Sequence, residues 1–266
     1  MAGTSFLIYH LERLPQTGTH TTEPTPLLPG NIWEDALFTS IKVLGRLEGL
    51  DVGCAMVTHR KGVRKGNSDD ERWFVRRTME FTAFVDEVRF WAFYDREAGL
   101  FAVQGESEGV TGAIGRLNQQ LRDRVALRKV TLDLQAIYRE FHEKQHVVEV
   151  RGAWCSHKAR TGHSGGSGYI GRQGLFGDMI STTDEFSGTV GRPDEVSGKA
   201  SEWEPTYLDL VTRFADNRIT LGISSSGNIY FKTECSLGTS LQIIKLLNQH
   251  STPIEPPKRG SKTQGK

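Results

Sequence analysis

The chain has 266 residues, and its 33 Lys and Arg against 32 Asp and Glu give a formal net charge of +1. Apolar residues make up 37% and charged residues 24%, a composition that excludes a disordered or fibrous chain. The near-neutral total excludes a protein that coats nucleic acid by bulk positive charge, and it leaves a local basic face open.

The first half of the chain predicts a mixture of strands and helices. Asn31 is a good N-cap, and apolar residues recur at helical spacing after it. Two β-rich runs around a short Gly-containing loop at 95–99 predict a hairpin. In order, we expect a strand at 5–11, a helix at 32–44, a strand at 50–58, a polar connection at 59–67, a strand at 71–84, hairpin strands at 88–94 and 100–104, and a helix at 110–124.

The second half predicts similar elements around a long Gly- and Ser-rich loop at 156–204. A loop of that length is normally functional or disordered. In order, we expect a strand at 128–134, a helix at 135–145, a strand at 146–155, the loop, a helix or strand at 207–214, a second hairpin at 218–223 and 229–233, and a helix at 240–248.

These elements predict an α+β fold in two halves, each a mainly antiparallel sheet with a hairpin followed by a packing helix. We expect one α+β domain at 1–124 and a second at 125–250 that holds the long loop. Residues 251–266 are rich in Pro, Lys and Gly, which predicts a disordered basic tail.

The expected location of the protein in the cell follows from its apolar runs, its N-terminal segment and its cysteines. No apolar run approaches the roughly 18 residues of a membrane span, and no signal peptide is recognisable. Cys54, Cys155 and Cys235 are odd in number and far apart, which favours reduced thiols over disulfides. We therefore expect a cytoplasmic protein without a membrane partner.

Motifs for catalysis are weak throughout. The Gly-rich run at 163–172 lacks the strand before and the helix after it that a phosphate loop needs. Cys155, His157 and His163 supply only three of the four ligands of a closed zinc site. Glu140 and Lys144, with Glu143 beside them, could serve a nuclease, but they also fit the polar side of an amphipathic helix. We expect no cofactor and no metal, and we favour a protein that is not an enzyme.

Basic residues gather in segments that contain few acids, whereas acidic residues concentrate at 178–204. Phosphate contacts depend on local charge, so separated blocks of charge can present a basic face. The alternative is that basic and acidic segments pair or are solvated. The candidate nucleic-acid-binding residues are Arg60, Lys61, Arg64, Lys65, Arg76, Arg77, Lys158, Arg160 and Arg172.

Aromatic residues are dense between 73 and 101, in the same region as several of these arginines. Proteins that bind single strands stack bases on exposed rings beside basic side chains. Strands alternate their faces, however, so many of these rings are expected to fill the core of an antiparallel sheet. The core is the favoured interpretation.

The segment 90–104, followed by Gly109-Val110-Thr111 at the start of a helix, resembles a pattern in a loose group of prophage and phage-defence proteins. The group includes uncharacterised prophage proteins, and it is more distantly similar in layout to the phage lambda exclusion protein A and to the DNA-binding subunit of the Kiwa defence system. The resemblance covers about one eighth of the chain. It implies a two-domain α+β protein that forms a homodimer and binds DNA with little sequence preference in antiviral defence, and it transfers no catalytic residue.

Our first hypothesis is a protein that binds nucleic acid, DNA before RNA, and that senses or blocks mobile genetic elements. The alternative is a protein-interaction subunit of a multi-component defence system, whose long loop folds on a partner encoded in the same operon. A third hypothesis is an unrecognised nuclease or hydrolase with a site at the loop.

Overall fold

The computed structural model describes residues 3–26, 36–65, 82–157, 167–170, 203–214 and 217–255. In these residues the chain is a mixed α and β protein with a large antiparallel sheet and three helices, and strand exceeds helix. It divides into two compact units. The N-terminal unit comprises Ser5–Leu7 and Leu11–Leu127, and the C-terminal unit comprises Met1–Thr4, Ile8–His10 and Arg128–Lys266.

The N-terminal unit is built on the strand order β2-β5-β6-β7-β8-β1. The pairings from β2 through β5, β6 and β7 to β8 are antiparallel. Its elements are β1 (Thr4–Arg13, shared with the other unit), β2 (Gly18–Thr21), β3 (Thr25–Pro26), β4 (Ala36–Leu37), β5 (Thr39–Arg46), β6 (Gly53–Lys65), β7 (Thr82–Asp95), β8 (Leu100–Gln104) and α1 (Ser107–Gln120).

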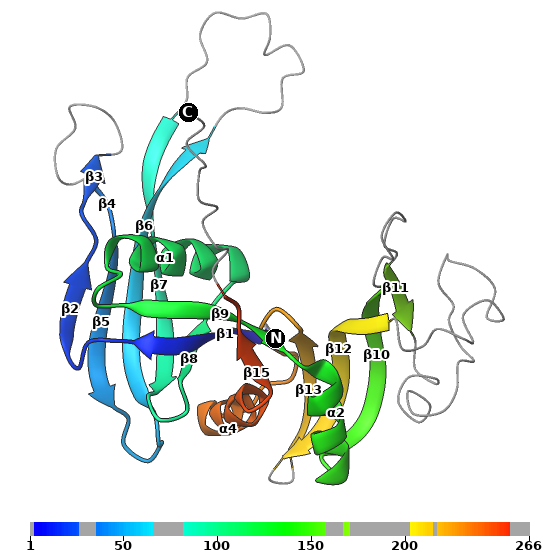
Figure 1. Ribbon diagram of the computed structural model, residues 1–266. Helices are drawn as coiled ribbons and strands as arrows, with labels where there is room; N and C mark the ends of the chain where they lie inside the picture. The colour runs from blue at the N-terminus through cyan, green and yellow to red at the C-terminus, as the bar shows by residue number, and fades with distance from the viewer. Residues whose placement is uncertain are drawn as a thin grey trace, which may run out of the picture. The chain divides into compact units, whose positions relative to one another are not determined.

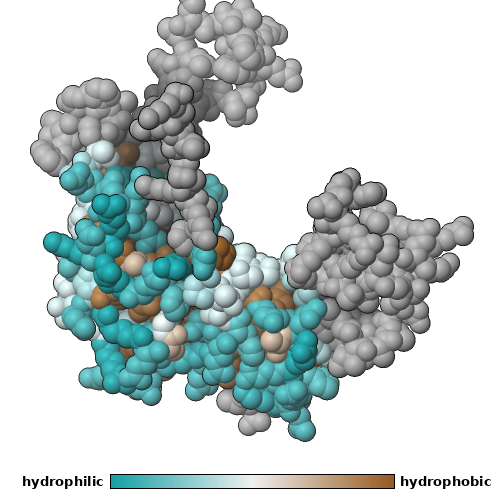
Figure 2. All heavy atoms as spheres, in the orientation of Figure 1, coloured by the Kyte–Doolittle hydropathy of each residue, from teal (hydrophilic) through white to brown (hydrophobic). Residues whose placement is uncertain are grey.

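Helix α1 crosses one face of β5 and β6 (Figure 1). It buries Val110, Ile114 and Leu117, which recur at helical spacing, so one apolar stripe faces the sheet. Figure 2 shows mainly hydrophilic side chains on the visible surface around α1, with smaller hydrophobic areas between them. The opposite face of the sheet carries no helix in the described part of this unit.

The C-terminal unit has the antiparallel strand order β11-β10-β12-β13-β14, and β9 pairs with β15. Its core combines one face of β12 to β14 with buried side chains of α2 and α4. Its elements are β9 (Ala126–Leu132, whose first two residues belong to the other unit), α2 (Leu134–Glu143), β10 (Val147–His157), β11 (Ser167–Ile170), β12 (Trp203–Phe214), β13 (Asn217–Ser224), β14 (Asn228–Phe231), α4 (Leu237–Asn248) and β15 (Ser251–Pro253).

Both predicted hairpins are confirmed, as β7–β8 and β13–β14, and each is followed by a helix, α1 or α4. The segment 207–214, for which helix and strand were both open, lies in strand β12. The division of the chain into domains after residue 124 stays a prediction.

The predicted helix at 32–44 is wrong for its described residues, which form β4 and β5. In β5, Ile41 and Val43 are buried, whereas Lys42 and Leu44 are exposed. This period of two fits a strand with one covered face, and it competes with the helical spacing that the prediction used. Asn31, the predicted cap, lies outside the described residues.

Two predicted irregular segments also contain strands. Residues 167–170 of the predicted long loop pair with β10 as strand β11, and residues 251–253 of the predicted tail pair with β9 as strand β15. In both cases a neighbouring strand supplies backbone hydrogen-bond partners that local composition does not reveal. The rest of the loop from 158 to 202, and the tail from 256, lie outside the described residues.

Candidate nucleic-acid interface

The face of β5, β6 and β7 that lies opposite α1 is the candidate site, and it is called the open face below. Residues directly opposite each other on paired strands share a face. Lys42 of β5 pairs with Met56 of β6, and Met56 pairs with Trp91 of β7. Their strand neighbours Ile41, Val57 and Ala92 are fully buried on the α1 side. The open face is formed by Ser40, Lys42, Met56, Thr58, Arg60, Glu87, Arg89 and Trp91.

Trp91 is the most prominent side chain of the open face. It is 46% exposed, although its neighbours Phe90 and Ala92 are buried. The sequence placed this ring in a crowded aromatic segment and favoured the core, and strand alternation sends Phe90 to the core and Trp91 outward. An exposed indole on a sheet face offers a large apolar surface on which a planar group can stack.

Cationic side chains share the open face with this ring. Arg89 lies two residues from Trp91 on the same strand face, and Lys42 lies across Met56 from it. Glu87 is the one carboxylate among the eight residues of the open face, and it accepts hydrogen bonds from Arg89 at 2.8 and 3.1 Å. The Arg60 Nε lies 3.6 Å from the same carboxylate, and its guanidinium lies 5.3 Å from the ring centre of Phe38. Three cations against one anion leave the face positive.

Strands β6 and β7 continue past the sheet as a two-stranded ribbon (Figure 1). The pairing of β5 with β6 ends at His59, whereas β6 pairs with β7 through Lys65. The predicted polar connection at 59–67 is therefore wrong as far as residue 65. Cross-strand pairs explain the error, because Arg60 lies opposite Glu87 and Lys61 opposite Asp86, and opposite charges across strands stabilise pairing.

The structure places the nine predicted binding residues as follows. Arg60 and Lys61 lie on opposite faces of the ribbon, and each lies 3.6 Å from a carboxylate, Glu87 or Asp86. The expected separation of this basic segment from acids therefore does not hold for these two residues, although exposed ion pairs of this kind are weak. Arg64 and Lys65 belong to β6. Arg76, Arg77, Lys158, Arg160 and Arg172 lie outside the described residues.

A buried histidine at the base of the ribbon was missed by the sequence analysis. His59 is 9% exposed, and its Nδ1 lies 2.8 Å from the Thr39 Oγ1. A Cβ at Gly112 of α1 would lie 3.7 Å from the His59 Nε2, so the helix passes close over the ring. Burial, followed by the charges of Arg116 and Lys61, lowers the pKa of His59, and the Asp86 charge opposes this shift. The alternation of strand β6, once recognised, would have placed this side chain inward.

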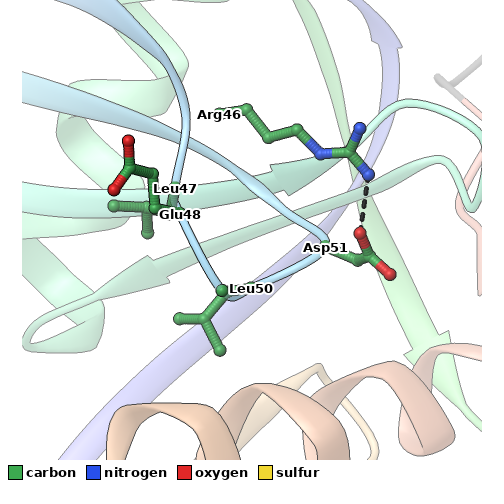
Figure 3. A pocket seen from close by; sticks show the side chains of 6 residues that line it. Arg46, Leu47, Glu48, Leu50 and Asp51 are labelled. Carbon is green, nitrogen blue, oxygen red and sulfur yellow. Dashed lines mark hydrogen bonds and ion pairs between the residues drawn. The ribbon is translucent and has the colours of Figure 1, made fainter.

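A shallow pocket lies in the turn between β5 and β6 and is lined only by residues 46–51 (Figure 3). The Arg46 Nη2 donates to the Asp51 Oδ1 at 2.6 Å, and both side chains are more than 70% exposed. The two charged groups satisfy each other across a single turn. We therefore place no binding site here.

The residues considered for catalysis have structural partners where they are described. Glu140 accepts a hydrogen bond from the Lys144 Nζ, one helical turn away, and its other carboxylate oxygen is hydrogen-bonded to the His250 Nε2. Hydrogen bonds to Lys144 and then to His250 lower the pKa of Glu140. No group of three or more potential metal ligands occurs in the described parts of the chain. The side chains of Cys155 and His157, and all of His163, lie outside this description.

Two further observations concern the cysteines and the helices. The thiols of Cys54 and Cys235 are free. Among the described helices, none combines the length and the apolar character needed to traverse a bilayer.

Comparison with known proteins gives no relative: no protein-family model matches the sequence, and no curated protein matches it.

Proposed function

We propose that this chain binds nucleic acid with little sequence preference through the open face of its N-terminal unit. The observation that carries the proposal is Trp91, an exposed indole on the same sheet face as Arg89 and Lys42, where no described helix of this unit covers it. Arg and Lys side chains bind phosphates at any sequence, and every base has a face that can stack on an aromatic ring. The combination supports binding without base selection.

The remaining parts of the proposal rest on the resemblance to prophage and phage-defence proteins. They comprise DNA as the target, a homodimer of two-domain chains in the cytoplasm, and a role in sensing or blocking mobile genetic elements. The β6–β7 ribbon supports the same function, because it carries Arg64 and Lys65 beyond the sheet. A narrow, basic projection of this kind can follow a phosphate backbone.

The test is a fluorescence anisotropy titration of labelled DNA of mixed sequence with the full chain at several salt concentrations. We expect a dissociation constant of about 10 µM or tighter at low salt, and a log–log salt dependence with a negative slope. No measurable binding at low salt, or an affinity that does not change with salt, would overturn the proposal, because phosphate contacts must release counterions.

Two variants test whether the open face is the binding surface. Trp91→Ala is expected to weaken binding by about 1–3 kcal/mol, which is about 5-fold to 150-fold. Arg89→Ala is expected to reduce the salt slope by about 0.7–0.9. The matched control for the second variant is Arg46→Ala, because Arg46 is an exposed arginine of the same unit that is paired with Asp51 away from the open face. Equal losses for Arg89→Ala and Arg46→Ala would argue against this face.

A further inference from the structure

The C-terminal unit carries three aromatic side chains on one face of its sheet, of which two are exposed and one, Tyr207, is half-buried. Trp154 of β10 lies directly opposite Tyr207 of β12. Tyr207 lies opposite Ser224, and Gly222, two residues earlier on β13, lies opposite Tyr230. The three rings therefore share a face. Trp154 is 48% exposed and Tyr230 is 39% exposed. We call these three residues the aromatic row.

The core of this unit does not require the aromatic row. The strand neighbours on the opposite face, which include Leu208, Leu221 and Ile223, are fully buried. A Cβ at Gly222 would overlap the Tyr207 hydroxyl and would lie 2.9 Å from the Tyr207 Cζ. The tyrosine ring consequently extends across the sheet above a glycine, where it is half-buried.

The charges beside the aromatic row balance. The Lys232 Nζ donates to the Asp209 Oδ2 at 2.7 Å and lies 5.9 Å from the Tyr207 ring centre. The Asp209 Oδ1 is buried without a hydrogen-bond partner among the described residues. Burial alone would lower the pKa of Lys232, but the hydrogen bond to Asp209 and the interaction with Tyr207 outweigh it and raise the pKa. The ion pair between Lys232 and Asp209 therefore leaves no net charge from these two residues beside the row.

We infer that the aromatic row is a stacking surface for unpaired bases, and that the chain therefore prefers single-stranded to duplex nucleic acid. This inference rests on the proposed function. Rings on adjacent strands lie about 5 Å apart, so the three strand steps from Trp154 to Tyr230 span about 14 Å, which exceeds the reach of one base. The faces of bases are hidden in a duplex and accessible in a single strand. The Asp209–Lys232 pair adds an acceptor and a donor for base edges.

Because the charges beside the aromatic row balance, binding there should depend less on salt than binding at a phosphate-binding surface. Stacking contributes about 1–3 kcal/mol per base and releases no counterions, whereas each phosphate contact adds to the salt dependence. Removal of a ring from the row should lower the affinity and leave the salt slope unchanged. Removal of Arg89 from the open face should lower the slope.

The experiment titrates the full chain with a labelled oligo(dT) single strand and with a labelled duplex of mixed sequence, over a range of salt. We expect tighter binding of the single strand. Trp154→Ala and Tyr207→Ala should each weaken single-strand binding by about 5-fold to 150-fold with an unchanged salt slope, and should leave duplex binding as it was. Trp154→Phe, which keeps a ring, should restore most of the affinity.

Leu237→Ala is the matched control, because Leu237 is 39% exposed in the same unit, as Tyr230 is, and belongs to α4. The inference is overturned if the wild type binds the duplex as tightly as the single strand, or if the ring variants bind the single strand like the control. Both ring variants are checked for folding by circular dichroism, and Trp154→Ala decides the outcome if Tyr207→Ala is unfolded. Failure of the wild type to bind either probe would instead overturn the proposed function.

Discussion

The buried His59 makes a pH-dependent contribution to stability whose sign follows from its surroundings. Burial, and after it Arg116 and Lys61, lowers the pKa of His59, so the folded chain binds a proton less readily than the unfolded chain. As the pH falls below the ordinary histidine value of about 6.5, the unfolded state takes up a proton that the folded state refuses. Stability is therefore lost on acidification, by at most about 1.4 kcal/mol per pH unit for one proton.

The variant His59→Leu removes the titrating ring and leaves the Thr39 Oγ1, 2.8 Å from the His59 Nδ1, without this partner. At neutral pH we expect the variant to be less stable by about 1–3 kcal/mol, the cost of an unsatisfied buried polar group. Urea unfolding at a series of pH values should show this difference shrinking as the pH falls below about 6.5, because only the wild type loses the histidine contribution.

Thr39→Val is the control for this experiment. It removes the same hydrogen bond and keeps the imidazole, so its stability should fall with pH in parallel with the wild type. A His59→Leu difference that stays constant between neutral and mildly acidic pH, or that widens on acidification, would refute the reasoning from burial and neighbouring charge.

Four other substitutions have outcomes that the described contacts predict. Glu87→Gln should strengthen DNA binding and steepen its salt dependence in the anisotropy assay, because Glu87 pairs with two arginines of the open face; weaker binding would contradict the assignment of that face. Gly115→Ala should raise the free energy of unfolding by about 1 kcal/mol, since nothing lies within 4 Å of the added Cβ and alanine favours a helix. Gly105→Ala should lower the free energy of unfolding by about 1–3 kcal/mol, because φ is +151° there and the Cβ would lie 2.6 Å from a ring carbon of Phe90. Urea titrations in which both glycine variants change stability in the same direction would refute these two predictions. Glu140→Gln should lower the free energy of unfolding by about 1–2 kcal/mol at neutral pH. This loss should disappear as the pH falls through the lowered pKa of the Glu140 carboxyl, and urea unfolding at neutral and acidic pH measures it.

Local sequence signals succeeded where an element is defined by its own residues. The two hairpins have β-rich strands around short turns with glycine, and the amphipathic helix α2 has Asp133 as its N-cap, whose side chain accepts from the Ala136 N–H. Such elements are stabilised by contacts a few residues apart, so their patterns are visible in the sequence.

The prediction at 32–44 failed because two periods were compatible with the same apolar residues. Trp33, Leu37, Ile41 and Leu44 recur at helical spacing, yet Ile41 and Val43 are the apolar residues buried in β5. Pairing with β6 on one side and β2 on the other decides between the periods. This information lies in distant residues, and tertiary contacts override weak local preference.

The candidate site, like the fold, was predictable from the sequence only in part. The sequence identified the basic and aromatic segment that contains Arg60 and Trp91, because composition reports which chemical groups are present. It did not distinguish Phe90 in the core from Trp91 on the surface, since a shift of one residue reverses the face of every side chain in a strand.

The amino-acid sequence by itself determined that this protein is an α+β chain with two hairpins, each followed by a helix. It also determined that arginines and aromatic rings cluster along the chain. Only the tertiary structure decided that β6 and β7 extend as a ribbon, that Arg60 and Lys61 lie opposite carboxylates, and that Trp91, Trp154 and Tyr230 are exposed. The physical reason is that strand register and helix placement depend on pairing between residues far apart in the chain, which also decides what each side chain faces.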